Sequence, residues 1–301
     1  MKILFSRGGT TASVGMRGGW ISYALSGCFN KHILKNNNVY DHIIVVLKQD
    51  YNNLNLLSTF KKSNKLILDV IDLLDVDKYD KNNNKVQPNF FPNIPKSYYD
   101  GYIVNNNKMK HWWRSNIDGD TSKPIFVIPH HWENRFKDLP CVDYKKYPYF
   151  YYLGYEGHEK QNCLHVESML RDGLVLEHRN GTTNPYYKDK PLHGVQFNVR
   201  FFESWEYCFK PATKISVAAA MDSLIITTYD WSVEDILDND YPYILKDSSY
   251  ETLKNMVEYV KNTHNTEIAT KAKECLQIAM NRTCLYNSIV PKYKNIVSYF
   301  Y

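Results

Sequence analysis

The sequence predicts an α/β protein of two domains, each built on a parallel β-sheet, with a mostly helical segment at the C-terminal end. Its 301 residues are about twice the length of a typical domain. Short apolar runs alternate with polar stretches along most of the chain, and this alternation is typical of β-α-β units with right-handed crossovers. Hydrophobic residues make up 44% and charged residues 23%, which excludes a disordered, collagenous or coiled-coil chain.

The first domain is predicted over residues 1–135. Its strands are expected where apolar residues run together, at residues 2–6, 42–47, 65–70, 101–104 and 125–128. A glycine-rich loop that contains Gly8 and Gly9 separates the first strand from a helix expected from Trp20. The loop does not match the Gly-x-Gly-x-x-Gly pattern of dinucleotide-binding folds. The asparagine runs, such as Asn105–Asn107, predict loops or helix caps.

The second domain is predicted over residues 136–301, after a proline-containing stretch that ends near Pro148 and forms the crossing between the domains. Apolar runs predict strands at 149–153, 174–177, 195–199 and 224–227, with helices at 159–171 and 213–221. Residues 249–301 are expected to be mostly helical. The two halves therefore share an architecture without sharing a sequence repeat.

Positive charge gathers at the N-terminal end. The chain has 37 basic and 32 acidic residues, a net charge of +5, and no acidic residue precedes Asp41. This distribution predicts an anionic ligand in this region, contacted by Arg7 or Arg17. A solvated basic edge without a ligand is the alternative.

Cysteine usage and hydropathy indicate a cytoplasmic protein without a membrane span. The six cysteines include no Cys-x-x-Cys pair, so a zinc knuckle or a redox motif is not supported. No apolar run approaches the ~20 residues that a bilayer requires, and the apolar stretch at the N-terminus is too short for a signal peptide.

The most specific segment is 209–227. It combines a proline that opens a helix, Thr213 and Lys214 in the first turn, a helix of small residues and a buried strand. A helix start offers free backbone amides, which together with a hydroxyl and the lysines Lys210 and Lys214 suit a diphosphate. An ordinary α/β helix with a surface lysine is the plainer interpretation.

This segment resembles the nucleotide-sugar-binding half of glycosyltransferases with the GT-B architecture of two Rossmann-like domains. Their pattern is Lys/Arg-Pro-x-x-Lys-(x)-x-x-Ala-x-x-x-Gly-x-Pro-(Ile/Val)-Ile, and it is matched by Lys210, Pro211, Lys214, Ala218, Ile225 and Ile226. Asp222 stands in place of the glycine and Leu224 in place of the proline. Tyr152–Tyr155 and Glu159–Asn162 resemble the first strand and loop of that domain.

The resemblance implies two Rossmann-like domains facing across a cleft, with the acceptor on the first and the nucleotide sugar on the second. It implies a donor site formed by Gly8, Gly9, Arg200, Lys210, Thr213 and Lys214. No metal and no cofactor beyond the donor substrate are expected, since lysines and helix amides would stabilise the departing diphosphate. An ion pair of Arg200 with Glu203 or Glu206 is the structural alternative for that residue.

The catalytic base is predicted less specifically. His130 follows the last strand of the first domain, at the carboxyl edge where ligands of open α/β sheets bind, and Asp69 ends an earlier strand. A linker role is the alternative for His130. Asp118-Gly119-Asp120 imitates an Asp-x-Asp metal signature but is interpreted as a turn. Because the paired glutamates of many retaining enzymes are absent, retention and inversion both stay open.

The sequence thus predicts a metal-independent glycosyltransferase that moves a sugar from a nucleotide sugar to a hydroxyl acceptor. Two alternatives remain. One is a glycosyltransferase that modifies a base in DNA, in which the basic N-terminal residues would follow the phosphates. The other is a non-catalytic nucleotide- or glycan-binding protein, because a fold does not dictate a function.

Overall fold

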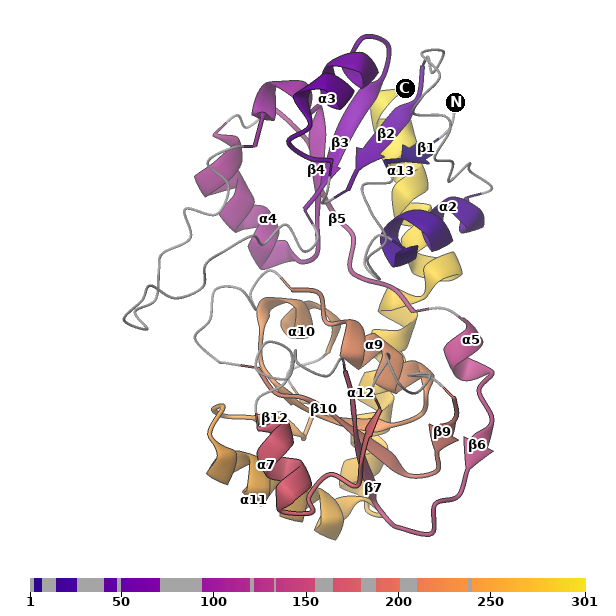
Figure 1. The fold of residues 1–301 in the computed structure, drawn as a ribbon, viewed down its shortest axis with the longest axis vertical. Coiled ribbons are helices and arrows are strands. Elements are labelled where there is room, and N and C mark those ends of the chain that lie inside the picture. The colour runs from indigo at the N-terminus through magenta and orange to yellow at the C-terminus, as the bar shows by residue number, and fades with distance from the viewer. Residues whose placement is uncertain are drawn as a thin grey trace. The chain divides into compact units, whose positions relative to one another are not determined.

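The computed structural model describes residues 3–6, 15–25, 41–47, 50–70, 94–119, 122–132, 134–154, 165–179, 188–200, 210–237 and 240–301. The chain forms two compact units (Figure 1). Unit 1 comprises Met1–His131, Cys208–Pro211 and Leu285–Tyr301, and unit 2 comprises Trp132–Tyr207 and Ala212–Cys284. The N-terminal part of unit 1 ends close to the predicted boundary at residue 135, but the C-terminal helix belongs to unit 1 and not to the second domain.

Unit 1 is built on a parallel sheet, as predicted. Its strands are β1 (Ile3–Phe5), β2 (Ile43–Val46), β3 (Lys65–Asp69), β4 (Gly101–Val104) and β5 (Ile125–Val127). They lie in the order β1-β2-β3-β4-β5, and every neighbouring pair is parallel. Nearly all their residues are buried, because helices cover the faces of a parallel sheet.

Local sequence signals place the helices of unit 1. These are η1 (a π-helix, Gly15–Trp20), α2 (Ile21–Ala24), α3 (Leu54–Lys61), η2 (Lys96–Tyr98), α4 (Asn107–Trp113) and η3 (a π-helix, Arg114–Asp118). The side chain of Asn53 caps α3, and that of Asn106 caps α4 by accepting a hydrogen bond from the Met109 amide. The predicted capping role of the 105–107 run is therefore confirmed. Gly119, with a φ of +59°, ends η3. Asp120 lies outside the described residues, so the turn predicted at Asp118-Gly119-Asp120 stays a prediction.

The last helix completes the core of unit 1. After η4 (a π-helix, Leu285–Ile289), α13 (Val290–Phe300) packs against the strands β1 and β2 (Figure 1). Its buried residues Tyr293 and Ile296 share a cluster with Phe5, Ile43 and Val45. This apolar face explains why the C-terminal helix belongs to unit 1, since burying it against the sheet removes it from water.

Unit 2 is also built on a parallel sheet. Its strands are β7 (Tyr149–Leu153), β8 (Glu177–Arg179), β10 (Gly194–Asn198), β11 (Leu224–Thr228) and β12 (Ile244–Leu245). The order is β12-β11-β10-β7-β8, so the chain moves outward in one direction from β7 and in the other from β10. A small parallel pair, β6 (Cys141–Val142) and β9 (Lys190–Pro191), completes the strands of this unit.

The helices of unit 2 are α5 (Asn134–Lys137), α7 (Val166–Arg171), α9 (Thr213–Ala220), α10 (Trp231–Ile236), α11 (Tyr250–Thr263) and α12 (Glu267–Thr283). The helical character predicted for residues 249–301 is confirmed by α11, α12 and α13. Among the described residues, no helix combines the length and the apolar composition that a membrane span requires.

One strand is shifted from its predicted place. The sequence predicts residues 174–177, but β8 begins only at Glu177. The preceding apolar residues close helix α7: Gly173 has a φ of +70°, and the Leu174 amide donates back to the Met169 carbonyl at 2.8 Å. Leu174 and Val175 then pack on the core as the hydrophobic contact that accompanies such a cap.

Candidate functional site

The start of α9 carries Thr213 and Lys214, two of the residues predicted to bind a diphosphate. Ala212 occupies the N-cap position and has no polar side chain, and no acidic residue lies in the first turn. Other helices of the unit, such as α10 and α11, have Asp230 and Ser249 as side-chain caps. The first amides of α9 and the hydroxyl of Thr213 are therefore the polar groups that its N-terminus presents.

Lys214 lies beside the end of the first strand of the unit. Its Nζ atom is 4.0 Å from the centre of the Tyr152 ring, which is fully buried in β7. The ring of His178 also packs on Tyr152, with the two ring centres 5.1 Å apart. A cation over a desolvated aromatic ring gains roughly 0.5–2 kcal/mol, so the ammonium is held next to the strand end.

Gly154 keeps this corner open for the tyrosine. A side chain at this position would collide with the Tyr152 phenol ring, and the Gly154 carbonyl contacts Nε2 of His178 at 3.1 Å. Tyr152 was not predicted as a site residue. The signal that indicates it is its place near the carboxyl end of a predicted parallel strand, where ligands of α/β sheets bind.

The topology supports the same location. In an open α/β sheet, ligands bind outside the carboxyl ends of the strands at the point where the strand order reverses. In unit 2 this point lies between β7 and β10. Tyr152 and Gly154 come from the end of β7, and α9 begins on the chain that follows β10 and packs on that strand. The predicted residues Thr213 and Lys214 are thus brought to the switch point of the sheet.

Arg200 forms an ion pair within the protein. Its Nη1 atom is 2.9 Å from Oδ2 of Asp230, and its amide donates to Oγ1 of Thr228. Burial raises the pKa of Asp230. The charge of Arg200 and the hydrogen bonds from the amides of α10 act in the opposite direction. Glu203 and Glu206, the partners considered from the sequence, lie outside the described residues. The guanidinium ties β10 to the start of α10. The predicted contact of Arg200 with phosphate stays a prediction.

The remaining predicted donor residues are placed in part. Lys210 is half-buried and lies in the segment Cys208–Pro211, which belongs to unit 1, whereas Thr213 and Lys214 belong to unit 2. Gly8 and Gly9 lie outside the described residues. The helix also begins two residues after Pro211, which shows that the proline precedes α9 and does not occupy its first turn.

In unit 1, Arg17 and Asp69 form a buried ion pair. Both side chains are fully buried, with the Arg17 Nε atom 3.0 Å from Oδ2 and Nη2 3.3 Å from Oδ1 of Asp69. This corrects two expectations. The Arg17 guanidinium is not available to an anionic ligand, and Asp69 is a partner of Arg17 and not an accessible base, because both carboxylate oxygens accept hydrogen bonds from it. Arg7 lies outside the described residues.

His130 follows β5 at the carboxyl edge of the unit 1 sheet, as predicted. Its ring stacks on that of His131, with centres 5.3 Å apart, and its Nδ1 atom lies 3.3 Å from the His131 carbonyl oxygen. Both histidines are buried. Burial lowers the pKa of His131 well below its ordinary value, and the charges of His130 and Arg17 act in the same direction. His131 is therefore neutral at physiological pH.

Asp50 is a further acidic residue at the same edge, and it was not predicted. It follows β2 and contacts Ser6, the residue after β1, whose hydroxyl accepts a hydrogen bond from the Leu47 amide at 2.9 Å. Burial raises the pKa of Asp50, and the contact with Ser6 opposes this shift. A desolvated carboxylate with a raised pKa is suited to accept a proton. Its position after the predicted strand 42–47 is the signal that indicates it.

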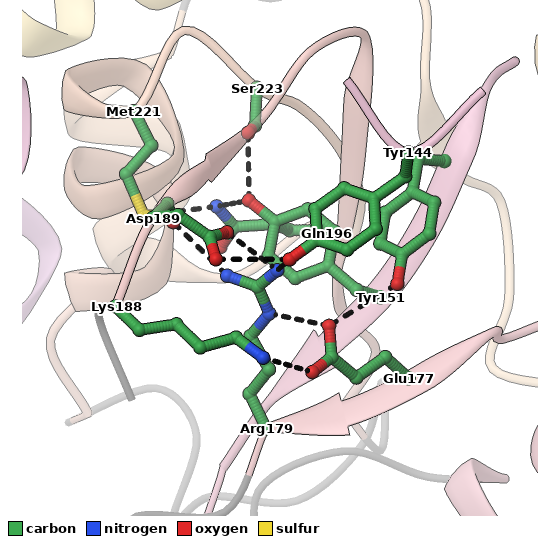
Figure 2. A network of polar contacts seen from close by, with 10 residues as sticks. Tyr144, Tyr151, Glu177, Arg179, Lys188, Asp189, Gln196, Met221 and Ser223 are labelled. Atoms are coloured by element: carbon green, nitrogen blue, oxygen red, sulfur yellow. Dashed lines mark hydrogen bonds and ion pairs between the residues drawn. The ribbon is translucent and has the colours of Figure 1, made fainter. Parts of the chain in front are cut away.

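A separate polar network in unit 2 is structural. Arg179 lies fully buried between two carboxylates, with Nε 2.8 Å from Glu177 Oε2 and Nη2 2.9 Å from Asp189 Oδ1. Figure 2 shows these contacts together with the Tyr151 hydroxyl, which bonds to Ser223 and Gln196 on neighbouring elements. Every charge in the network is paired. It joins β7, β8 and β10, and each of the three guanidinium nitrogens of Arg179 has a partner within the network.

The described part of the chain contains no group of three His, Cys, Asp or Glu side chains that could bind a metal ion. The positive groups placed at the switch point are the ammonium of Lys214 and the helix amides. The chemistry that this arrangement offers is the binding of an anion such as a diphosphate.

Comparisons with known proteins identify the fold. No family model and no curated protein matches the sequence. HepE of Anabaena, solved with UDP and glucose, aligns with a TM-score of 0.56 and 10% identity over 98% of this chain and 84% of that one. A glycosyltransferase from Rickettsia africae aligns with a TM-score of 0.51 and 13% identity, covering 98% of this chain and 83% of that one.

A chain of the GtfA/B complex also aligns, with a TM-score of 0.53 and 10% identity over 89% of this chain. This chain spans only 59% of the length of that one. At such identities the likeness establishes the fold, which is the GT-B fold of glycosyltransferases.

Proposed function

We propose that this chain, on its GT-B fold, transfers a sugar from a nucleotide-sugar donor to a hydroxyl acceptor. The observation that carries the proposal is the start of α9, where an N-terminus without an acidic residue presents Thr213 and Lys214 at the switch point of the unit 2 sheet. HepE has been solved with UDP and glucose and with UDP-glucose, which supports a nucleotide sugar as the ligand class.

The site chemistry follows from charge development. As the bond between the anomeric carbon and the diphosphate breaks, negative charge grows on the departing phosphate oxygens. The amides at the start of α9, the Thr213 hydroxyl and the Lys214 ammonium stabilise this charge, so that the reaction needs no divalent metal and no cofactor besides the donor. Tyr152 holds the ammonium near the strand end before the substrate binds.

The acceptor is proposed to bind at the carboxyl edge of unit 1. In an inverting reaction, a base takes the proton of the acceptor hydroxyl. The hydroxyl oxygen then bonds to the anomeric carbon as the bond to the nucleoside diphosphate breaks and the diphosphate leaves. His130 and Asp50 are the two candidates at this edge. His130 can accept the proton on an imidazole nitrogen, and Asp50 on a carboxylate oxygen whose pKa burial raises.

We infer a cytoplasmic location for this reaction, which the free thiols of Cys141, Cys275 and Cys284 support. The DNA-base alternative is less favoured, because Arg17, one of its basic residues, is buried in an ion pair. A non-catalytic binding protein would bind the nucleotide without turning over the nucleotide sugar. A turnover assay beside the binding measurement therefore separates it from an enzyme.

Nucleotide titration tests the donor site. We expect Lys214→Met to weaken binding of the nucleoside diphosphate about ten- to a hundred-fold, because a charge-assisted contact to phosphate is worth ~1.5–3 kcal/mol. The measurement is isothermal titration with UDP and other nucleoside diphosphates, followed by turnover of the nucleotide sugar whose diphosphate binds.

Lys254→Met is the matched control. Lys254 lies on α11 of the same unit, and its Nζ atom is also placed over a tyrosine ring, 5.4 Å from the centre of Tyr250. Tyr250 contacts the Ser168 carbonyl and Asp172 at the end of α7, away from the α9 start, so the removal of Lys254 should leave affinity unchanged. Equal affinities of wild type and Lys214→Met for every diphosphate would reject the donor site.

A further inference from the structure

Arg17 connects three segments of unit 1 at the carboxyl edge of its sheet. It comes from the π-helix η1, and its bidentate contact with Asp69 reaches the end of β3. Its other contacts are to backbone: Nη1 donates to the Pro129 carbonyl at 3.0 Å, and Nη2 donates to the Ile128 carbonyl at 3.1 Å. Ile128 and Pro129 are the residues that lead from β5 to the two histidines.

The guanidinium geometry explains why arginine stands here. Its planar fork directs donors to a carboxylate on one side and to two carbonyls on the other, which a lysine ammonium cannot do at once. Stability alone does not require this pair, since a buried ion pair can often be replaced by apolar residues of similar volume without loss. What an apolar replacement removes is the hold on the carbonyls of Ile128 and Pro129.

The same helix also supports the histidine rings. Trp20, at the end of η1, meets the ring of His131 edge to face with centres 5.9 Å apart, and His131 in turn stacks on His130. His131 is fully buried, and within the described part of unit 1 neither of its ring nitrogens has a hydrogen-bond partner. The position of the His130–His131 pair is thus set by ring packing and by the backbone that Arg17 holds.

We infer that Arg17 and Asp69 act as a positioning pair, which holds the segment Ile128–His131 so that His130 is presented to the acceptor. This inference rests on the proposed function, in which His130 is a candidate base at this edge. The pair itself touches no substrate. It acts through the backbone before His130, where a displacement of about 1 Å can cost about a hundred-fold in rate.

Two variants separate positioning from charge. Arg17→Met/Asp69→Leu removes both charges, so that neither is left buried alone, and Arg17→Lys keeps the positive charge next to Asp69 but cannot reach both carbonyls. We expect kcat for transfer to fall about ten- to a hundred-fold in the double variant. We expect UDP affinity to stay within about twofold, since Thr213 and Lys214 lie in unit 2.

Tyr293→Phe is the control within the same cluster. The Tyr293 hydroxyl lies 3.4 Å from Oδ2 of Asp69, and its loss leaves the hydrogen bonds of Arg17 to Asp69, Ile128 and Pro129 in place. This variant should retain the wild-type kcat. A double variant that folds and keeps the wild-type kcat and KM would overturn the inference. Wild type without turnover of any nucleotide sugar would instead reject the proposed function.

A measurement on the wild type keeps the inference testable if the variants do not fold. In an NMR titration, the C2–H resonance of a held and buried His131 should not shift between about pH 5.5 and 8, whereas a solvated imidazole titrates there. A His131 resonance that titrates as a free imidazole does would show that the segment Ile128–His131 is not held, and would also overturn the inference.

Discussion

Replacing Arg179 by methionine should destabilise the protein by about 3 kcal/mol, because it leaves a carboxylate without its cation in a buried network. Arg179 is fully buried and contacts Glu177 and Asp189, as Figure 2 shows. Methionine fills much of the same space, so the loss of stability comes mainly from the lost charge contacts and not from a cavity.

The expected loss of stability depends on which partners Glu177 and Asp189 keep when Arg179 is replaced. Removing one partner of a buried pair costs about 3–5 kcal/mol. Glu177 keeps a second cation, since the Lys188 Nζ atom is 3.0 Å from its Oε1 atom. Among the described residues, Asp189 keeps the hydroxyl of Tyr144, which donates to Oδ2 at 2.9 Å, but no second cation. One acid is thus uncompensated and the other partly compensated, which places the expected loss near the lower end of that range.

Lys188→Met supplies the comparison, because the same Glu177 carboxylate loses its other cation. The Lys188 side chain is 36% exposed, so water screens the pair and the expected loss is below about 1 kcal/mol. Equilibrium urea unfolding at neutral pH, followed by circular dichroism, gives both values by linear extrapolation. Equal losses for the two variants, or a loss below 1 kcal/mol for Arg179→Met, would refute the reasoning.

Two further predictions concern pH and metal. Burial alone would raise the pKa of Glu177, but hydrogen bonds from Lys188 and Arg179 lower it below its ordinary 4.5. The stabilisation by the Glu177 carboxylate is thus present above pH 4.5 and is lost as the pH falls through its lower pKa in the folded state. Glu177→Gln should therefore make Tm fall less steeply as the pH is lowered. An equally steep fall of Tm from pH 7 to about 3 in wild type and variant would contradict this. Transfer should also survive EDTA, since lysine and helix amides replace a metal at the diphosphate, and a loss of activity that Mg²⁺ or Mn²⁺ restores would reject that role.

Local patterns in the sequence determine the elements of this protein. Apolar runs mark β4 and β7 with their observed bounds, and the run of small residues after Pro211 marks α9. Asn106 is recognisable as a cap because a short amide side chain before a helix bonds to its first amides. The proposed donor residues Thr213 and Lys214 are likewise local, since they are neighbours in the first turn of α9.

The tertiary structure alone decides the partners. Arg17 and Asp69 are 52 residues apart, and the sequence shows two charges but neither their burial nor their pairing. It gives no sign that Arg200 would pair with Asp230, or that α13 would complete the core of unit 1. Helix and strand preferences act over a few residues, whereas burial and ion pairing depend on which distant segments the sheet order brings together, and that order is settled only when the whole core packs.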